Sequence, residues 1–360
     1  MQNNPTVIKQ EHKRSFGLDL VRAIAISLVL IAHFAYKFEH FGFWGVEMFF
    51  ALSGYLIGQI LWKSFSSNDD WSFKRIHNFW SRRWWRTLPN YYLFLFLMLI
   101  FHYWQHGVLP SLLRFSYYLW FGQNLLSGSP EFFGVSWSLC IEEWFYLSFP
   151  IVLFLISKIN LSKRVSFSVT IFVFFVFSVI MRQYLINQGV SHPRGITLAR
   201  LDAICFGVMV VFIFSGNVAR NQLKKIFFAL GLLLFFISFY LVYLSGLTYD
   251  EIKENQFVLT LTPLAFAFML PFIENWPGLK LKFVNTAITN ISLWSYSIYL
   301  SHIPVLFVCY EVFSFMRASS AGNLFSKILA LGFTIIISAF IYKKFEVPLT
   351  KRRPKEVTNS

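Results

Sequence analysis

The feature that most constrains this chain is a series of apolar runs, each near twenty residues long, that recurs along almost its whole length. A helix of about 20 apolar residues spans the hydrocarbon core of a bilayer. Ten runs have this length: 18–37, 43–62, 88–105, 136–157, 166–186, 198–214, 226–245, 257–273, 290–315 and 325–342. They predict an all-α membrane protein with about ten transmembrane helices.

Composition supports this class. The chain is 56% hydrophobic and only 14% charged, and it contains 45 phenylalanines. Such a composition excludes an ordinary water-soluble domain and makes the lipid bilayer the first expected partner. The region 108–126 is also apolar, but Pro110, Arg114 and Gly122 interrupt it. We therefore expect a re-entrant or interfacial segment there.

The basic residues alternate between the two sides of the predicted spans. One set of segments carries most of the lysines and arginines, whereas the opposite set holds little beyond Lys37, Arg114, Arg194, Lys253 and Arg317. Cytoplasmic loops carry an excess of Lys and Arg, so both termini are expected in the cytoplasm. The net charge of +15 then follows from topology. It requires no nucleic-acid partner.

The predicted spans form one unit. We expect a cytoplasmic N-terminal segment at 1–17, a single transmembrane domain at 18–348, a basic cytoplasmic tail at 349–360 and no fused extracytoplasmic domain. The polar opening segment lacks the apolar core of a signal peptide, so the first helix is expected to be an uncleaved signal anchor. The cysteines have no spacing typical of metal ligands, and no metal is expected. The oligomeric state cannot be read from the sequence.

The first span carries one arginine and one histidine, Arg22 and His33. At eleven residues apart on a helix they lie about 20° apart around the axis and about 16 Å apart along it. They therefore share one helix face at two membrane depths. Ionisable groups inside a span indicate a site that faces a polar cavity. The alternative is that Arg22 contacts cytoplasmic headgroups and His33 is a packed polar residue.

The second span carries Glu47 near its outer end, at the same predicted depth as His33. A carboxylate–imidazole pair is possible there, and it would orient the imidazole and raise its basicity. The alternative is a buried Glu47 bound by backbone or hydroxyl groups. Ser53 and Gly54 follow in mid-helix, where small residues allow helices to approach closely or make room for a ligand.

An arginine-rich segment precedes the third span, in the sequence SRRWWRTLPNYY. It places Arg82, Arg83 and Arg86 on the cytoplasmic side, as Arg22 is. Guanidinium groups bind phosphate oxygens and stack on aromatic rings, so a phosphorylated cytoplasmic ligand is one interpretation. The other is an anchor that contacts anionic lipid headgroups.

Two adjacent carboxylates, Glu142 and Glu143, lie inside the span 136–157. Neighbouring helical residues point about 100° apart, so at most one of them is expected to line a shared cavity directly. We favour Glu142. A lipid-facing pair at this depth would be energetically costly.

Two later groups of polar residues add to the same region. Arg200 and Asp202 are expected to pair with each other or with other cavity charges, and a purely structural bridge is the favoured alternative. Tyr296, Tyr299 and His302 lie near the middle of the ninth span. Residues 299 and 302 are neighbours on one helix face. The alternative for His302 is a packed polar group.

With these residues in view, the chain resembles the acyltransferase 3 family of integral membrane acyltransferases. The resemblance covers roughly residues 18–348. It rests on the order and spacing of six motifs: LDLVRAIAISLVLIAH, GVEMFFALSGYLIG, RRWWRTLPNYY, WSLCIEEWFY, RLDAICFG and SYSIYLSHIPV. The acidic residue of the family's second helix is commonly Asp, whereas this chain has Glu47, which has a longer side chain.

The resemblance implies an O-acyltransferase in the bacterial cytoplasmic (inner) membrane. It would move an acyl group, expected to be acetyl, from cytoplasmic acyl-CoA to a hydroxyl of a cell-envelope or secreted carbohydrate. Acceptors in the family include O-antigen, capsule, exopolysaccharide, peptidoglycan and lipid-linked sugars. Acyl-CoA would be a co-substrate, with no permanently bound cofactor.

The same resemblance assigns roles to residues. The family's arginine–histidine pair falls on Arg22 and His33, its acidic residue on Glu142, and its arginine-rich segment on Arg82, Arg83 and Arg86. We expect those arginines to bind the phosphates of acyl-CoA.

His33 is the expected general base on the acceptor hydroxyl, with Glu142 or Glu47 orienting its ring. The expected supporting residues are Ser53, Trp137, Ser138, Arg200, Asp202, Tyr296, Tyr299 and His302. A transporter or flippase for a polar lipid or sugar, and a membrane sensor, are the competing functions.

Overall fold

The fold comes from a computed structural model, and the structure is described for residues 14–67, 71–126, 132–216, 220–316 and 319–357. Within these ranges every regular element is a helix, which confirms the all-α class. Residues 1–13 of the expected N-terminal segment and residues 358–360 of the expected tail lie outside the described residues.

The described helices follow one another in chain order from α1 to α13. They are α1 Phe16–Phe34, α2 Glu39–Ser67, α3 Phe73–His106, α4 Leu112–Leu119, α5 Ser136–Ser157, α6 Lys163–Asn187, α7 Leu201–Phe214, α8 Arg220–Phe239, α9 Tyr249–Glu254, α10 Gln256–Ile273, α11 Lys282–Val312, α12 Ser320–Ile341 and α13 Val347–Thr350. Short 3₁₀ turns lie at Tyr36–Phe38, Pro193–Gly195, Thr197–Ala199 and Ser314–Met316, and π-helical turns extend α8 and α12 at Tyr240–Leu244 and Tyr342–Glu346.

Nine helices in the described ranges are long and apolar enough to cross a membrane, and they coincide with nine of the ten expected spans. The remaining span, 88–105, lies within α3, which at 34 residues is long enough. Asn90, His102 and Gln105 make this stretch more polar than the others. That α3 crosses the membrane therefore stays a prediction.

The segment 108–126 does not form a span. It contains only the eight-residue helix α4, which packs against α3. The hydroxyl groups of Tyr91 and Tyr92 donate to the backbone carbonyls of Tyr118 and Leu119, at 2.8 and 2.7 Å. These bonds hold the C-terminal end of α4 against the middle of α3, and whether the segment is re-entrant or interfacial stays a prediction.

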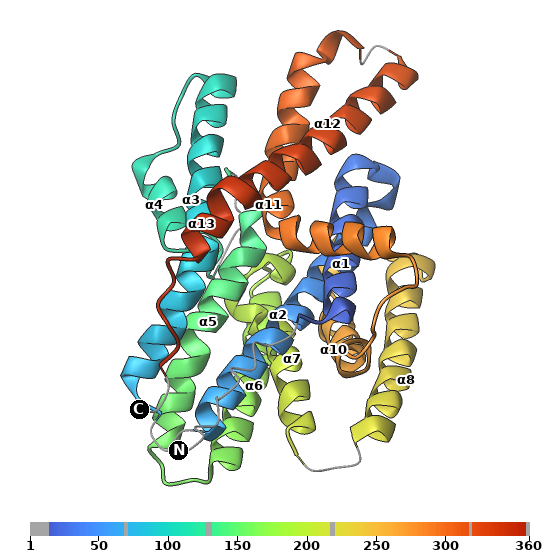
Figure 1. The fold of residues 1–360 in the computed structure, drawn as a ribbon. Coiled ribbons are helices and arrows are strands. Elements are labelled where there is room, and N and C mark those ends of the chain that lie inside the picture. The colour runs from blue at the N-terminus through green and yellow to red at the C-terminus, as the bar shows by residue number, and fades with distance from the viewer. Residues whose placement is uncertain (1–13, 68–70, 127–131, 217–219, 317–318, 358–360) are drawn as a thin grey trace, which may run out of the picture.

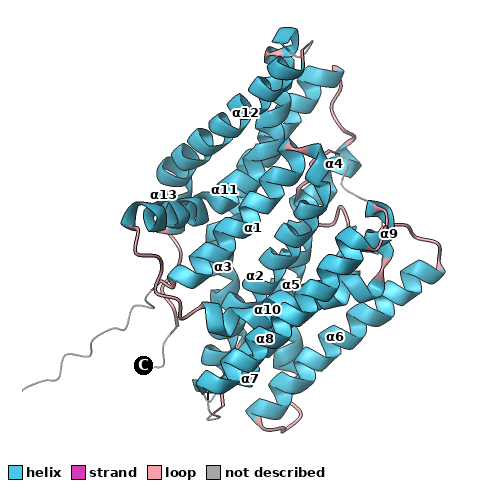
Figure 2. Ribbon diagram, turned by 90° about the vertical axis from the view of Figure 1, so that its right-hand side faces the viewer, coloured by secondary structure: helices cyan, strands magenta, loops and turns pink. Residues whose placement is uncertain are grey.

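The helices α1 and α2 lie between a group that contains α3, α5 and α13 and a group that contains α8 and α10 (Figure 1). Most of the long helices follow a common direction, as in a bundle (Figure 2). α2 approaches α7 very closely: a Cβ added to Gly54 would fall 1.8 Å from the carbonyl oxygen of Ile204. The expectation that small residues near Ser53 permit close helix packing is confirmed.

Both ends of the described chain lie on one side of the bundle. Arg14, which precedes α1, and Arg353, which follows α13, line the same cavity. The expected placement of the two ends on one side of the membrane fits this arrangement. That this side faces the cytoplasm is still inferred from the distribution of basic residues.

Candidate active site

Two adjoining cavities open among α1, α2, α3, α5 and α11. The larger, which we call the vestibule, has a volume of about 790 Å³ and lies on the side of the two chain ends. The smaller, which we call the inner pocket, has a volume of about 110 Å³. Arg22, Leu56, Arg83 and Arg86 line both cavities. The cavities therefore meet at a ring that carries three arginines.

The vestibule is strongly basic. Its acidic lining residues are Asp19, Glu274, Glu346 and Glu356. Its basic lining residues are Arg14, Arg22, Lys63, Arg75, Arg82, Arg83, Arg86, Lys351 and Arg353. Walls of one dominant charge sign raise the local concentration of ligands of the opposite sign. The vestibule therefore suits a ligand with several negative charges.

The three shared arginines, which we call the inner arginine cluster, come from different helices. Arg22 on α1 donates to Ser292 at 3.1 Å and lies 3.4 Å from the carboxylate of Asp19, which Arg14 also holds at 2.5 Å. Arg83 on α3 donates to the hydroxyl of Tyr146 at 2.7 Å. Its guanidinium lies 4.4 Å from the centre of the Tyr146 ring.

Arg86 differs from its neighbours, because it makes no hydrogen bond or ion pair with any described residue. It is exposed at the junction of the two cavities. Arg82 lies further out in the vestibule wall. It donates to the backbone carbonyl of Pro354 at 2.9 Å and lies 4.0 Å from the carboxylate of Glu356. Arg82 therefore lies in the vestibule, as expected of a residue that binds acyl-CoA. Its side chain is held by the C-terminal segment of the chain.

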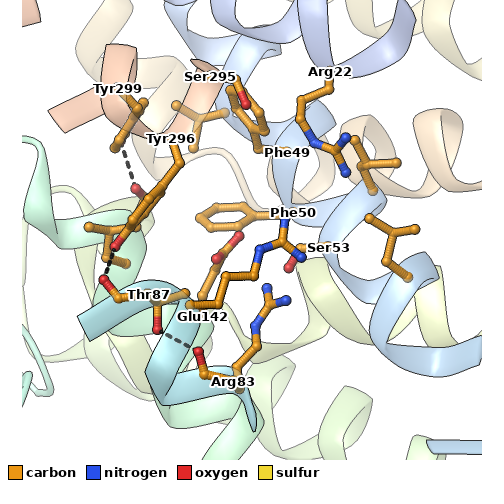
Figure 3. Close-up of a pocket in the computed structure, with 16 residues that line it drawn as sticks. Arg22, Phe49, Phe50, Ser53, Arg83, Thr87, Glu142, Ser295, Tyr296 and Tyr299 are labelled. Carbon is orange, nitrogen blue, oxygen red and sulfur yellow. Dashed lines mark hydrogen bonds between the residues drawn. The ribbon is translucent and has the colours of Figure 1, made fainter. Parts of the chain in front are cut away.

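The inner pocket contains the favoured carboxylate. Arg22 and Arg83 enter this pocket from two helices, with Phe50 and Glu142 between them in the view of Figure 3. The hydroxyl of Tyr146 donates to Glu142 at 3.2 Å and also contacts the hydroxyl of Ser53.

The neighbouring carboxylate lies elsewhere: Glu143 accepts a hydrogen bond from Thr87 at 2.9 Å. The structure thus places Glu142 rather than Glu143 in the cavity, as expected.

The ninth expected span, α11, supplies the opposite wall of the inner pocket. Tyr299 and Ser138 join α11 to α5 through their hydroxyl groups, 2.6 Å apart, and Tyr296 donates to the backbone carbonyl of Thr87 at 2.9 Å (Figure 3). Ser53, Ser138, Tyr296 and Tyr299 all line the pocket. Four of the expected supporting residues therefore do meet around one hollow.

His33 lies beyond this pocket, near the end of α1. Its Nδ1 is 2.8 Å from the backbone carbonyl of Val29, so Nδ1 carries the proton and Nε2 keeps a lone pair. The ring of His302 lies edge-to-face with the ring of His33, at a centroid distance of 4.8 Å. The ring centroids of Tyr299 and His302 are 5.8 Å apart. Tyr299 and His302 thus connect the inner pocket to His33.

The expected pairing of His33 with Glu47 is wrong. Glu47 is fully buried and accepts hydrogen bonds from Arg194, at 3.3 Å, and from Arg200. Each oxygen of this carboxylate binds a guanidinium group, and no contact with His33 is formed. Glu142 does not orient His33 either, because its hydrogen bond is to Tyr146.

Arg200 and Asp202 do not pair with each other. Arg200 binds Glu47, and Asp202 binds Arg182 at 2.9 Å. Together with Arg194 these residues form what we call the outer arginine cluster: Glu47, Arg182, Arg194, Arg200 and Asp202. Trp137 belongs to its surroundings, since the guanidinium of Arg194 lies 4.7 Å from the centre of the Trp137 ring. Arg200 and Asp202 therefore each pair with another charge rather than with each other, and a structural role for this cluster stays a prediction.

Sequence reasoning missed Tyr146, Thr87, Arg182 and Arg194. Arg182 was visible as a lone arginine within the apolar run 166–186, and Tyr146 follows the two glutamates by one helical turn. Arg194 was noted only as one of the few basic residues in the opposite set of segments, and Thr87 gave no signal. Among the described residues, no group of three or more His, Cys, Asp or Glu side chains is arranged to hold a metal ion.

The comparisons with known proteins agree on one family. The family model described as an acyltransferase domain, of the acyltransferase 3 type, matches residues 15–343. No solved structure matches the chain.

Three relatives illustrate the similarity to curated proteins. OatA of Listeria monocytogenes, named a peptidoglycan O-acetyltransferase, is 26% identical over 93% of this chain and 56% of its own length. YrhL of Bacillus subtilis, named "Putative peptidoglycan O-acetyltransferase", is 28% identical over 82% of this chain and 49% of its own length. A Staphylococcus aureus (strain COL) protein named "Putative O-acetyltransferase SACOL0978" is 26% identical over 93% and 57%. The chain thus spans about half the length of the curated relatives it matches.

Proposed function

Because this chain belongs to the acyltransferase 3 family, we propose that it is a membrane O-acyltransferase that moves an acyl group from acyl-CoA to a hydroxyl of a cell-envelope carbohydrate. The observation that carries the proposal is the inner arginine cluster at the junction of a basic vestibule and a narrow inner pocket. We take the acyl group to be acetyl, as in the names of the relatives.

The donor enters from the cytoplasm through the vestibule. Coenzyme A carries a pyrophosphate and a further phosphate, and guanidinium groups bind such oxygens in bidentate geometry. Arg86 has its donors unoccupied by described residues, and it lies beside Arg22 and Arg83. Phosphates held at this ring leave the pantetheine arm to pass into the inner pocket, whose walls include Val46, Phe49 and Phe50.

His33 performs the proton transfer. Its Nε2 takes the proton of the acceptor hydroxyl, the hydroxyl oxygen forms a bond to the thioester carbonyl, and the carbon–sulfur bond breaks. The proton then passes from His33 to the departing thiolate of CoA. His33 is exposed, so an acceptor on the outer side reaches it without entering the vestibule.

The names of the relatives support the proposed acceptor class. Two of them are named for peptidoglycan, and the family resemblance adds O-antigen, capsule, exopolysaccharide and lipid-linked sugars. All of these are carbohydrates outside the cytoplasm, and this supports an enzyme of the bacterial cytoplasmic (inner) membrane whose vestibule faces inward.

The test is CoA release from acetyl-CoA by detergent-purified protein supplied with envelope glycans, comparing wild type with His33→Ala. General-base catalysis typically contributes about 10²–10⁴-fold, so we expect His33→Ala to lose that much turnover while it still binds acetyl-CoA. His40→Ala is the matched control, because His40 packs on Tyr243 and Tyr249 away from both cavities. Movement of a polar lipid or sugar across vesicles without CoA release would instead support a transporter or flippase.

A further inference from the structure

Two imidazole rings meet at the outer end of α1. His33 and His302 lie edge-to-face, with their ring centroids 4.8 Å apart and their planes 68° apart. Nδ1 of His302 lies 2.7 Å from the backbone carbonyl of Tyr299 and 3.2 Å from that of Ile298, so it is the donor. Both rings therefore hold their protons on Nδ1 and present a bare Nε2 lone pair.

His302 has an unused hydrogen-bond acceptor inside the protein. The residue is fully buried, and its Nε2 has no hydrogen-bond partner among the described residues. Leaving a buried polar group unpaired destabilises the folded state. A packing residue at this position would not need to be a histidine. The unpaired lone pair indicates a partner that appears only in another state of the site.

The reaction itself produces such a partner. When His33 takes a proton it becomes an imidazolium, and its new Nε2–H is a strong, charge-assisted donor. No carboxylate is available to stabilise it, because Glu47 binds two arginines and Glu142 binds Tyr146. A centroid distance of 4.8 Å leaves room, after a small ring rotation, for a nitrogen–nitrogen hydrogen bond of about 3 Å.

We propose that His302 is a positioning residue that accepts a hydrogen bond from protonated His33 during acyl transfer. This inference rests on the proposed function. The proton leaves the acceptor hydroxyl for Nε2 of His33, is stabilised there by the lone pair of His302 while the oxygen–carbon bond forms and the carbon–sulfur bond breaks, and then passes to the CoA thiolate. A neutral imidazole performs this role without burying a further charge.

Two substitutions separate hydrogen bonding from packing. His302→Phe keeps a planar ring against His33 and removes the acceptor. His302→Gln keeps an amide oxygen near the position of Nε2. Hydrogen bonds to charged groups are typically worth about 10- to 150-fold, so we expect His302→Phe to lower kcat by about that factor with the KM for acetyl-CoA unchanged. His302→Gln should recover kcat to within about tenfold of wild type.

The outcomes distinguish this inference from the proposed function. A wild-type kcat in His302→Phe, or equal losses in the Phe and Gln variants, would overturn the role of His302 while an inactive His33→Ala still upholds the general base. If wild type releases no CoA, or if His33→Ala is fully active, the proposed function fails and the inference fails with it. Should His302→Phe not fold, as judged by acetyl-CoA binding and thermal unfolding, His302→Leu takes its place with the same expected loss.

Discussion

Two arginine clusters lie among the described residues, and their arginines are paired in opposite ways. In the outer arginine cluster Arg182, Arg194 and Arg200 each contact a buried carboxylate directly, either Glu47 or Asp202. In the inner arginine cluster Arg22 shares Asp19 with Arg14, Arg83 rests on Tyr146, and Arg86 contacts no described partner. The outer cluster has no cavity beside it among those we describe, whereas the inner cluster surrounds the junction of two.

This difference separates structural charge from charge reserved for a ligand. Burying an unpaired ion is costly, so a buried arginine in a finished structure is normally paired. An arginine that faces a water-filled cavity avoids this cost and keeps its donors available. Pairing, rather than the presence of arginine in a span, is therefore the informative property.

The largest expected effect separates the clusters by stability. Arg200→Ala leaves the fully buried Glu47 with Arg194 alone, and breaking a buried pair typically costs about 3–5 kcal/mol in the free energy of unfolding. Arg86→Ala breaks no pair and should change the free energy of unfolding by no more than about 0.5 kcal/mol. Thermal unfolding in detergent measures both variants. Equal losses of stability would contradict the distinction.

A smaller effect is expected from the carboxylate within the inner pocket. Glu142→Gln keeps the shape of the side chain and an acceptor for Tyr146 but removes a negative charge from among the arginines. We expect acetyl-CoA to bind about fivefold more tightly, the scale of one charge interaction. Turnover should fall about tenfold, because the hydrogen bond from Tyr146 becomes weaker.

The control for this prediction is Glu143→Gln. Glu143 lies outside the two cavities and binds Thr87, so its amide should leave acetyl-CoA binding unchanged. Titration calorimetry measures the binding. Weaker acetyl-CoA binding in Glu142→Gln would show that the negative charge of Glu142 does not repel acetyl-CoA.

The smallest effect concerns the rim of the vestibule. Arg353 lines this cavity, whereas Lys355, two residues further along the same segment, does not. Solvent-exposed charge interactions contribute about 0.2–1 kcal/mol, so Arg353→Gln should weaken acetyl-CoA binding two- to fivefold at low salt. Lys355→Gln should leave it unchanged. The difference should shrink at high salt, because screening reduces interactions between exposed charges.

Sequence reasoning predicted well which residues line the cavities, and predicted poorly which charged residues pair across helices. The apolar runs fixed which residues share a membrane level, and this was enough to bring Arg22, Arg83 and Arg86 to one cavity and Glu142 to the pocket beyond it. The expected equal depth of Glu47 and His33 was wrong: Gly42 of α2 packs on Ala32 and Gly45 on Ala25 and Val29, so Glu47 lies level with a part of α1 well before His33. The partners of Glu47 could not be predicted, because several helices present polar groups at the same level and the sequence does not say which of them adjoin.

The misassigned pairs show the missing information. Arg194 and Arg200 lie in and beside the 3₁₀ turns before α7, about 150 residues after Glu47, and only the packing of α7 on α2 brings them there. Asp202 likewise binds Arg182, on the preceding helix, rather than Arg200, which is two residues away in sequence. Which residues pair across helices depends on helix rotation, and hydrophobic periodicity constrains rotation weakly in a helix that is apolar on all sides.

The central claim is that the inner arginine cluster is reserved for the phosphates of an acyl-CoA donor. The most direct measurement is acetyl-CoA binding to purified wild type, Arg86→Ala and Arg164→Ala. Arg164 stacks on Phe212 and lines neither cavity, which makes it a matched loss of charge. We predict micromolar affinity for wild type, as is common for enzyme substrates. Arg86→Ala should bind about tenfold or more weakly, and Arg164→Ala should match wild type. No binding by folded wild type, or equal binding by all three proteins, would contradict the account.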